Sequence, residues 1–108
     1  IALGSASKNA SLILEKTGIL GLFDAIIDGN HVSKSKPDPE VFLKGAEALE
    51  VENDTCVVFE DAFAGVQASK AAGMAAVGIG SVEVLNNADF VVKGLFEMSP
   101  SQIITKIL

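Results

Sequence analysis

Hydrophobic residues along the chain collect in five short runs, separated by longer stretches in which apolar positions recur three and four residues apart. Most of the short runs are rich in β-branched or aromatic residues, which is typical of strands, and the longer stretches have the period of helices. The expected strands span residues 1–4, 23–27, 55–59, 74–79 and 89–92. Strands that alternate with helices at short spacing predict an α/β fold, doubly wound around a mostly parallel sheet.

The stretches between the strands carry helix start and stop signals. Asn9 is predicted to cap the first helix and Asp38 the second. Ser99 and Gln102 have the spacing of a capping box and predict the start of a last helix. The expected helices cover residues 9–16, 39–49 and 62–72, and a stretch from residue 99 onward.

The composition bounds the class of protein. A chain of 108 residues is one domain at most. Fourteen acidic residues stand against eight basic ones, all lysines, so the net charge of −6 argues against a nucleic-acid partner. No apolar run has the length of a membrane span and no signal peptide is evident. The single cysteine, Cys56, is expected to be a small buried core residue, and a cytoplasmic location is predicted.

The most informative pair of residues is Glu60-Asp61, which follows the expected strand 55–59 and precedes a helix. Two adjacent carboxylates at a strand end repel each other and are costly to bury. A Mg²⁺ ion offsets that cost, because it binds carboxylate oxygens and leaves room for phosphate oxygens. The competing interpretation is that the two acids only favour the first turn of the helix.

Two further polar residues are expected at the same edge of the sheet. Ser5 follows the first strand, and Lys36 precedes the helix that starts near Pro39. Ligands of doubly wound folds bind outside the carboxyl ends of the strands, so a hydroxyl, an ammonium and two carboxylates there would bind a phosphate and its metal. Taken singly, Ser5 fits a turn residue and Lys36 a solvated loop lysine.

Three segments carry a resemblance to a known family. Gly4 to Asn9, Lys34 to Phe42 and Phe59 to Ala68 resemble the haloacid dehalogenase superfamily, and the resemblance extends over nearly the whole chain. It implies the Rossmann-like core of that superfamily and phosphoryl transfer on a sugar phosphate. The Lys36-Pro37 pair and the Glu60-Asp61 motif are shared across its sugar phosphatases, whereas the run from Ser5 to Asn9 is more particular to its mutases.

The resemblance also implies residue roles. Ser5 matches the phosphate-binding hydroxyl, with the backbone N–H of Ala6 beside it, and Lys36 matches the lysine that neutralises the transferring phosphoryl group. Glu60 and Asp61 match the Mg²⁺ carboxylates. The next three residues match groups that hold the non-transferring phosphate of a bisphosphate intermediate: Ser7, Lys8 and Asn9.

One departure from the superfamily is large. Its nucleophile is an aspartate in an Asp-x-Asp motif on the first core strand, and no Asp-x-Asp occurs in this sequence. The superfamily's helical cap is absent as well. We therefore expect residues 1–108 to be the C-terminal portion of the core domain, to lack the central strand of the sheet, and to be inactive without the preceding segment of the same protein.

Three functions remain open at this point. The run Ser7 to Asn9 favours a mutase, which would interconvert β-glucose 1-phosphate and glucose 6-phosphate. A sugar-phosphate phosphatase of the same superfamily is the main alternative. A non-enzymatic response-regulator receiver is the third, but a receiver has its acidic pair early and its lysine late, whereas Lys36 precedes Glu60 here.

Overall fold

The computed structural model of the protein describes residues 1–107. Its strands are β1 (Ala2–Gly4), β2 (Ala25–Ile27), β3 (Val57–Glu60), β4 (Ala75–Ile79) and β5 (Phe90–Val92). Its α-helices are α1 (Ala10–Lys16), α2 (Glu40–Leu49), α3 (Phe63–Ala71) and α4 (Pro100–Ile107). Short 3-10 helices cover Leu20–Leu22 and Asn53–Thr55.

The α/β alternation predicted from the sequence is confirmed, with small shifts at element ends. Thr55 belongs to a 3-10 turn, so the third strand begins at Val57 and reaches Glu60. The capping box of α4 is present, since the N–H of Gln102 donates to Ser99 Oγ and the N–H of Ser99 donates to Gln102 Oε1. Asn9 occupies the cap position of α1 but makes no side-chain cap bond, which corrects that prediction.

The described strands are all parallel and form two sheets instead of one. β1 pairs with β2, with Leu3 opposite Ile26. β4 lies between β3 and β5, with Val77 opposite both Phe59 and Phe90. β1 and β3 each have a hydrogen-bonded partner on only one side among residues 1–107, so each leaves one long edge unpaired.

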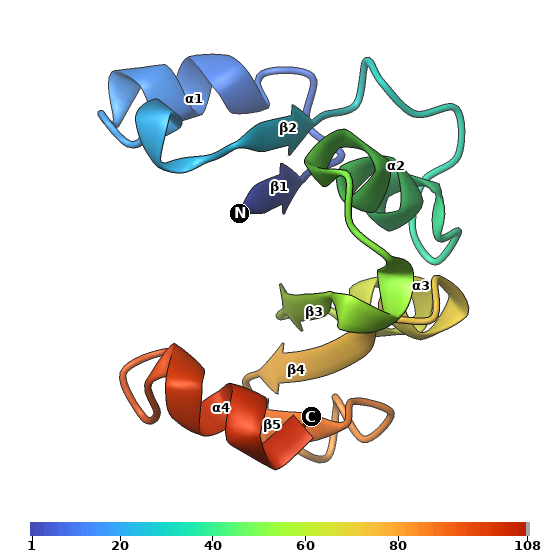
Figure 1. Ribbon diagram of the computed structural model, residues 1–108, viewed down its shortest axis with the longest axis vertical. Coiled ribbons are helices and arrows are strands. Elements are labelled where there is room, and N and C mark those ends of the chain that lie inside the picture. Colours follow the sequence, from blue (N-terminus) through green and yellow to red (C-terminus); the bar gives the residue numbers. More distant parts are fainter. Residues whose placement is uncertain (108) are drawn as a thin grey trace.

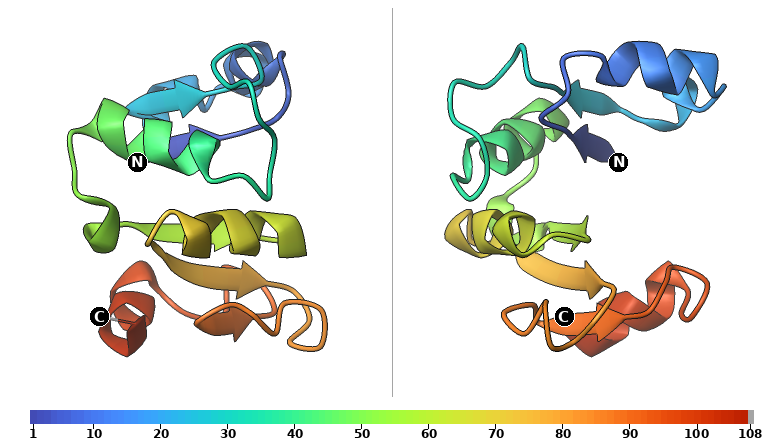
Figure 2. Two further views of the ribbon diagram at one scale, coloured as in Figure 1. Left: turned by 90° about the vertical axis from the view of Figure 1, so that its right-hand side faces the viewer. Right: turned by 180° about the vertical axis from the view of Figure 1, so that it is seen from behind.

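The helices cover both faces of the strands. α2 and α3 lie on one side, and α1 and α4 lie on the other (Figures 1 and 2). α2 contacts β1, β2 and α3, so it connects the two sheets. Parallel strands covered on both faces are the arrangement that the sequence pattern predicted.

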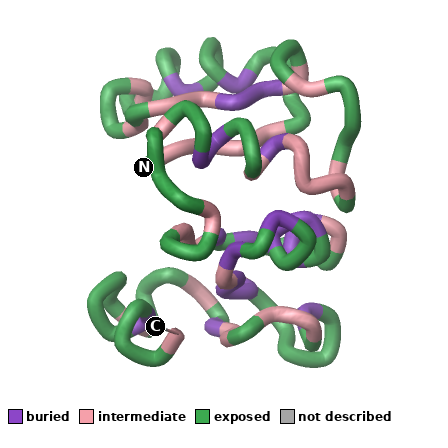
Figure 3. Tube along the Cα trace, turned by 45° about the vertical axis from the view of Figure 1, so that its right-hand side comes forward, coloured by how far each residue is buried: buried purple, intermediate pink, exposed green. Residues whose placement is uncertain are grey.

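The fully buried side chains gather around the three-stranded sheet. Val66 of α3 packs with Ala76 and Leu85, and Ile103 of α4 packs with Val77 and Val92 on the opposite face. Figure 3 shows the same contrast along the trace, where α3 buries four of its nine residues and α1 only two of its seven. The apolar core therefore sits on β4 and the helices on either side of it.

An open apolar groove of about 440 Å³ separates the two sheets. Its walls are the facing strands β1 and β3, and residues of α2 such as Phe42 and Gly45 line it between them. Cys56 also lines the groove and is partly exposed, so the prediction of a buried core cysteine is wrong. The residue stands just before β3, where its carbonyl accepts the N–H of Ala75 at 3.2 Å.

Within the described residues, none of the helices is long and apolar enough to cross a membrane.

Candidate active site

Ser5 marks the point where β1 ends and the chain turns toward α1. Its N–H donates to the carbonyl of Ile27 at 2.9 Å and so continues the pairing of β1 with β2. Its hydroxyl accepts the N–H of Ser7 at 3.1 Å, and the Ser7 hydroxyl in turn accepts the N–H of Asn9 at 3.1 Å. Two successive serine turns therefore give the segment from Ser5 to Asn9 a defined backbone.

A neighbouring turn holds this segment in place. The N–H of Gly29 donates to the Ser7 carbonyl at 3.2 Å, and the Asn30 side-chain amide donates to the Lys8 carbonyl at 3.3 Å. A Cβ atom on Gly29 would lie 2.3 Å from the Ala6 carbonyl oxygen, which no side chain can occupy. Glycine is therefore required where the turn after β2 approaches the turn after β1.

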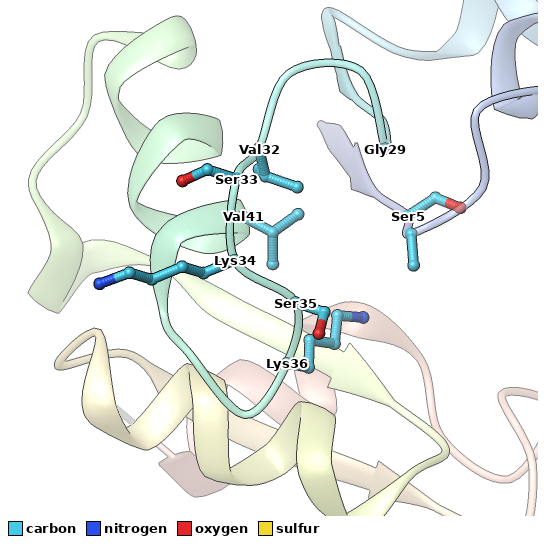
Figure 4. A pocket seen from close by; sticks show the side chains of 9 residues that line it. Ser5, Gly29, Val32, Ser33, Lys34, Ser35, Lys36 and Val41 are labelled. Carbon is cyan, nitrogen blue, oxygen red and sulfur yellow. The ribbon is translucent and has the colours of Figure 1, made fainter.

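A pocket of about 190 Å³ lies between these turns and the start of α2. Ser5 and Gly29 lie on one side of it, and Lys36 and Val41 lie on the other (Figure 4). Ala6 also lines the pocket. The remaining residues that line it belong to the loop after β2: Val32, Ser33, Lys34 and Ser35. In Figure 4 the Ser5 hydroxyl points away from Lys36, and it accepts the N–H of Ser7. A ligand in the pocket would therefore meet the Lys36 side chain on one side and the turn of Ser5 and Ala6 on the other.

The ammonium of Lys36 connects this pocket to the three-stranded sheet. Its Nζ lies 2.6 Å from Oε2 of Glu60, and the two side chains are only 22% and 10% exposed. The same Nζ lies 5.0 Å from the centre of the Phe42 ring, within range of a cation–π contact. A charge-assisted hydrogen bond between largely buried partners fixes the ammonium at the carboxyl end of β3.

Glu60 occupies its position because the first turn of α3 has a glycine, Gly65, beside it. A Cβ atom on Gly65 would lie 2.0 Å from the carboxyl carbon of Glu60, so the carboxylate rests directly against the helix backbone at that residue. The N–H of Asp61 donates to Oε1 of Glu60 at 3.2 Å. Asp61 itself is exposed, next to the buried carboxylate.

The residues present fit part of a Mg²⁺ site. Mg²⁺ is commonly held by one or two protein carboxylates together with water and phosphate oxygens. Glu60 and Asp61 supply two adjacent carboxylates, one buried and one facing solvent. Among residues 1–107 no group of three or more histidine, cysteine, aspartate or glutamate side chains is gathered as a complete metal cage. Further oxygen ligands would have to come from a phosphate or from other protein groups.

The structure brings together only some of the site residues predicted from the sequence. Ser5, Ala6 and Lys36 line one pocket, and Glu60 contacts Lys36. The remaining predicted residues are exposed and do not line that pocket: Ser7, Lys8, Asn9 and Asp61. Gly29 and the loop 32–35 were not among the sequence-derived candidates, although the polar run from Ser33 to Ser35 directly before Lys36 is a signal that could have indicated them.

The carboxyl ends of β1 and β3 thus both lie next to the pocket that Ser5 and Lys36 line. Ser5 follows β1 and shares the pocket with Lys36, while Lys36 binds Glu60 at the end of β3. In open α/β folds, ligands bind outside the carboxyl ends of the parallel strands, so this is where a ligand of the fold is expected to bind. The family "Haloacid dehalogenase-like hydrolase" matches residues 1–79, and the chain belongs to it.

Individual relatives agree with this assignment. The chain is 45% identical over 93 residues to the β-phosphoglucomutase of Bacillus subtilis (strain 168), a match over 86% of this chain and 41% of that protein. It is 43% identical over 79 residues to the fructose-1-phosphate phosphatase of Escherichia coli (strain K12), over 73% of this chain and 42% of that enzyme. The chain spans less than half the length of these relatives.

A solved structure has the same fold. The crystal structure of β-phosphoglucomutase from Clostridium difficile superimposes with a TM-score of 0.94 at 40% sequence identity, over 98% of this chain and 48% of that one. Membership of the haloacid dehalogenase-like family decides against the receiver-domain alternative.

Proposed function

We propose that this chain forms the C-terminal part of the core domain of a Mg²⁺-dependent enzyme that transfers a phosphoryl group on a sugar phosphate. The observation that carries the proposal is the position of Lys36, whose ammonium borders the pocket of Ser5 and Ala6 and bonds to Glu60. We assign the roles that the resemblance to the family implies: Ser5 and the N–H of Ala6 bind phosphate oxygens, and Lys36 neutralises charge on the transferring group.

Glu60 and Asp61 are the residues that would hold the metal ion. When bound, Mg²⁺ supplies positive charge beside the phosphate oxygens. Glu60 already holds Lys36, so this carboxylate would fix the position of the ammonium relative to the metal. Asp61 is exposed and free to turn toward a bound ion. Asp61→Ala is therefore expected to reduce Mg²⁺ affinity and turnover together.

The groove between β1 and β3 supports the idea of a separate nucleophile strand. It is bordered by two unpaired strand edges, and Glu60 lies at its end nearest the pocket. A parallel strand laid between β1 and β3 would pair with both edges and deliver its carboxyl end to Lys36. We propose that this position belongs to the Asp-x-Asp strand of the full-length enzyme, whose aspartate attacks phosphorus in line with the leaving oxygen.

The reaction that we favour is the interconversion of β-glucose 1-phosphate and glucose 6-phosphate. A mutase must hold a second phosphate while the first one reacts, and the exposed run Ser7 to Asn9 begins where the Ser5 pocket ends. Lys8 supplies charge there. The phosphatase alternative is supported by the similarity to fructose-1-phosphate phosphatase, and it would need no second anion site.

The experiment is a phosphorus NMR assay of the full-length enzyme with β-glucose 1-phosphate and Mg²⁺. A mutase yields glucose 6-phosphate, whereas a phosphatase yields inorganic phosphate. Lys36→Ala is expected to lower turnover by roughly 10²–10³-fold, the scale of losing one transition-state electrostatic partner. Turnover within a few-fold of wild type would contradict the role of Lys36.

A second variant separates the two reactions. Lys8→Ala is expected to weaken binding of glucose 1,6-bisphosphate more than binding of glucose 6-phosphate, because only the bisphosphate carries a group for the second anion site. Equal losses for both ligands would favour the phosphatase.

A further inference from the structure

The loop that carries Lys36 is held by one carboxylate at the start of α2. Glu40 accepts the N–H of Ser33 through Oε1 at 2.8 Å and the N–H of Lys34 through Oε2 at 3.1 Å. The Ser33 hydroxyl adds a bond to Oε2 at 3.0 Å. A single side chain therefore binds two consecutive backbone amides and a hydroxyl of the pocket loop.

These bonds close the segment from Ser33 to Glu40 into a loop with Lys36 near its middle. On the other side of Lys36, the N–H of Asp38 donates to the Ser35 carbonyl at 3.0 Å, and Asp38 Oδ1 accepts the N–H of Glu40. The backbone before and after Lys36 is thus fixed to the first turn of α2. A lysine has a long flexible side chain, so a fixed backbone restricts where its ammonium can lie.

A second lysine orients the carboxylate. Lys44 lies one helical turn after Glu40, and its Nζ is 3.5 Å from Glu40 Oε1 while it also donates to the His31 carbonyl. The backbone hydrogen bond from Ser33 is the main cause that holds the pKa of Glu40 below its ordinary range, so the carboxylate stays ionised at neutral pH. An ionised carboxylate accepts stronger hydrogen bonds than a neutral acceptor.

We propose that Glu40 is a positioning residue for phosphoryl transfer, which acts by holding the loop 33–36 so that the Lys36 ammonium meets both the phosphate pocket and Glu60. This inference rests on the proposed function of Lys36. Glu40 does not line the pocket itself and touches no reacting group. It acts only through the backbone of the loop, and its effect must therefore disappear when Lys36 is removed.

The test is a double-mutant cycle in the full-length enzyme. Glu40→Ala is expected to lower kcat by roughly 10-fold, because small displacements of a catalytic group carry large costs. Glu40→Gln keeps one acceptor oxygen and is expected to lie between wild type and Glu40→Ala. The double variant Lys36→Ala/Glu40→Ala is expected to be no slower than Lys36→Ala alone, since Glu40 acts through Lys36.

The control is Glu47→Ala. Glu47 is an exposed acid on the same helix, and its side chain makes no hydrogen bond or ion pair within residues 1–107, so kcat should not change. Additive losses in the cycle would overturn the proposal, because a residue that only stabilises the fold would slow the Lys36→Ala enzyme further. A loss in Glu47→Ala equal to that in Glu40→Ala would overturn it as well.

Two readouts do not depend on sugar-phosphate turnover. The amide protons of Ser33 and Lys34 should exchange faster in Glu40→Ala than in wild type, with no change for the amides of β4. The same cycle measured on the affinity for inorganic phosphate should show the same non-additivity. An enzyme that transfers no phosphoryl group from any sugar phosphate would refute the proposed function alone, whereas unchanged amide exchange in Glu40→Ala or additive phosphate affinities would refute the role of Glu40.

Discussion

The two sheets of the molecule differ in how completely they are packed. The three-stranded unit, made of β3, β4, β5, α3 and α4, contains Val66 and Val77 with no exposed surface and Leu85 with 1%. In the two-stranded unit, made of β1, β2 and α1, most strand residues are only half-buried. Its helix α1 and the turn after it expose large apolar side chains, including Leu12 at 51% and Leu22 at 66%. One unit has a finished core and the other does not.

The difference in packing shows which strand lacks a neighbour among residues 1–107. β4 has a strand on each side and a helix on each face, so its three central residues, Ala76, Val77 and Gly78, are buried within residues 1–107. β1 has a strand on one side and the open groove on the other. Two of the groups proposed to bind the transferring phosphate, Ser5 and Ala6, follow β1 and so lie on the incomplete unit.

The largest expected effect comes from filling the groove. Residues 1–108 alone are expected to show no phosphoryl transfer, since no Asp-x-Asp motif occurs in the sequence and the proposed reaction needs that nucleophile. A peptide that carries the Asp-x-Asp strand should restore turnover and raise the unfolding temperature, because it pairs both open edges. Calorimetry and a phosphate-transfer assay with and without the peptide measure this. A peptide with both aspartates changed to asparagine should stabilise the fold without restoring activity.

Two results would contradict that prediction. Turnover by residues 1–108 without any peptide would show that a nucleophile is already present. A cooperative melt of the isolated monomer at high temperature would show that the two-stranded unit is complete without a further strand.

A smaller effect is expected from the contact that links the two units. In Gly65→Ala the new methyl group would overlap the Glu60 carboxylate, so Glu60 must turn and release Lys36. We expect turnover of the full-length enzyme to fall by about 10-fold or more, although alanine favours the helix itself. Gly21→Ala is the control, because nothing lies within 4 Å of a Cβ atom at that position. Equal activity in both variants would show that the Lys36–Glu60 contact is dispensable.

The packing difference itself can be measured with two leucines. Leu85→Ala removes a fully buried side chain from the three-stranded unit and should cost about 2–5 kcal/mol of unfolding free energy. Leu12→Ala removes one that is half-exposed on α1, and the cost should stay below about 1 kcal/mol. Denaturant unfolding of the peptide-bound chain gives both values. Similar costs at the two positions would mean that the units are packed alike.

The smallest effect concerns acid stability of the three-stranded unit. Burial acts to raise the pKa of Asp89, but hydrogen bonds from Lys70 at 2.6 Å and from the N–H of Ala76 at 2.8 Å outweigh it, and the pKa lies below its ordinary value of 3.8. A lowered pKa in the folded state means that Asp89 stabilises the fold above pH 3.8 and that this contribution is lost as the pH falls through the lowered value.

The pair is partly exposed, so the effect should be about 1 kcal/mol or less. Unfolding free energies measured from pH 6 down to pH 2 should fall less steeply for Asp89→Asn than for wild type. Glu47→Gln, which changes an exposed acid without partners among residues 1–107, should follow the wild-type curve. Parallel curves for all three proteins would contradict the assignment.

Local sequence signals were sufficient for most of the fold. The alternation of strand and helix periods and the capping box of Ser99 and Gln102 are both encoded by neighbouring residues. They correctly predicted element type and order. The element ends were less certain, because Thr55 continues a β-rich run yet is drawn into a 3-10 turn.

The sequence predicted several residues of the candidate site, because their types and positions at strand ends are visible in it, but it did not predict their contacts. Ser5, Lys36 and Glu60 were named from sequence, but the 2.6 Å bond between Lys36 and Glu60 depends on how two sheets are placed in space. The role of Glu40 was hidden for a related reason. A glutamate in the first turn of a helix is expected to interact favourably with the helix dipole. Nothing in the sequence shows that its carboxylate also accepts the N–H groups of Ser33 and Lys34.

Cys56 gives the open groove a built-in chemical reporter. It is the only cysteine in the sequence, it lines the groove, and burial raises the pKa of its thiol, so the group remains protonated at neutral pH. A thiol reagent applied at alkaline pH therefore labels one defined position in the wall beside β3. The rate of that alkylation measures how accessible the Cys56 thiol is from the groove. The mass of the labelled protein therefore reports whether the groove is occupied, even in a mixture where neither activity nor melting is observable.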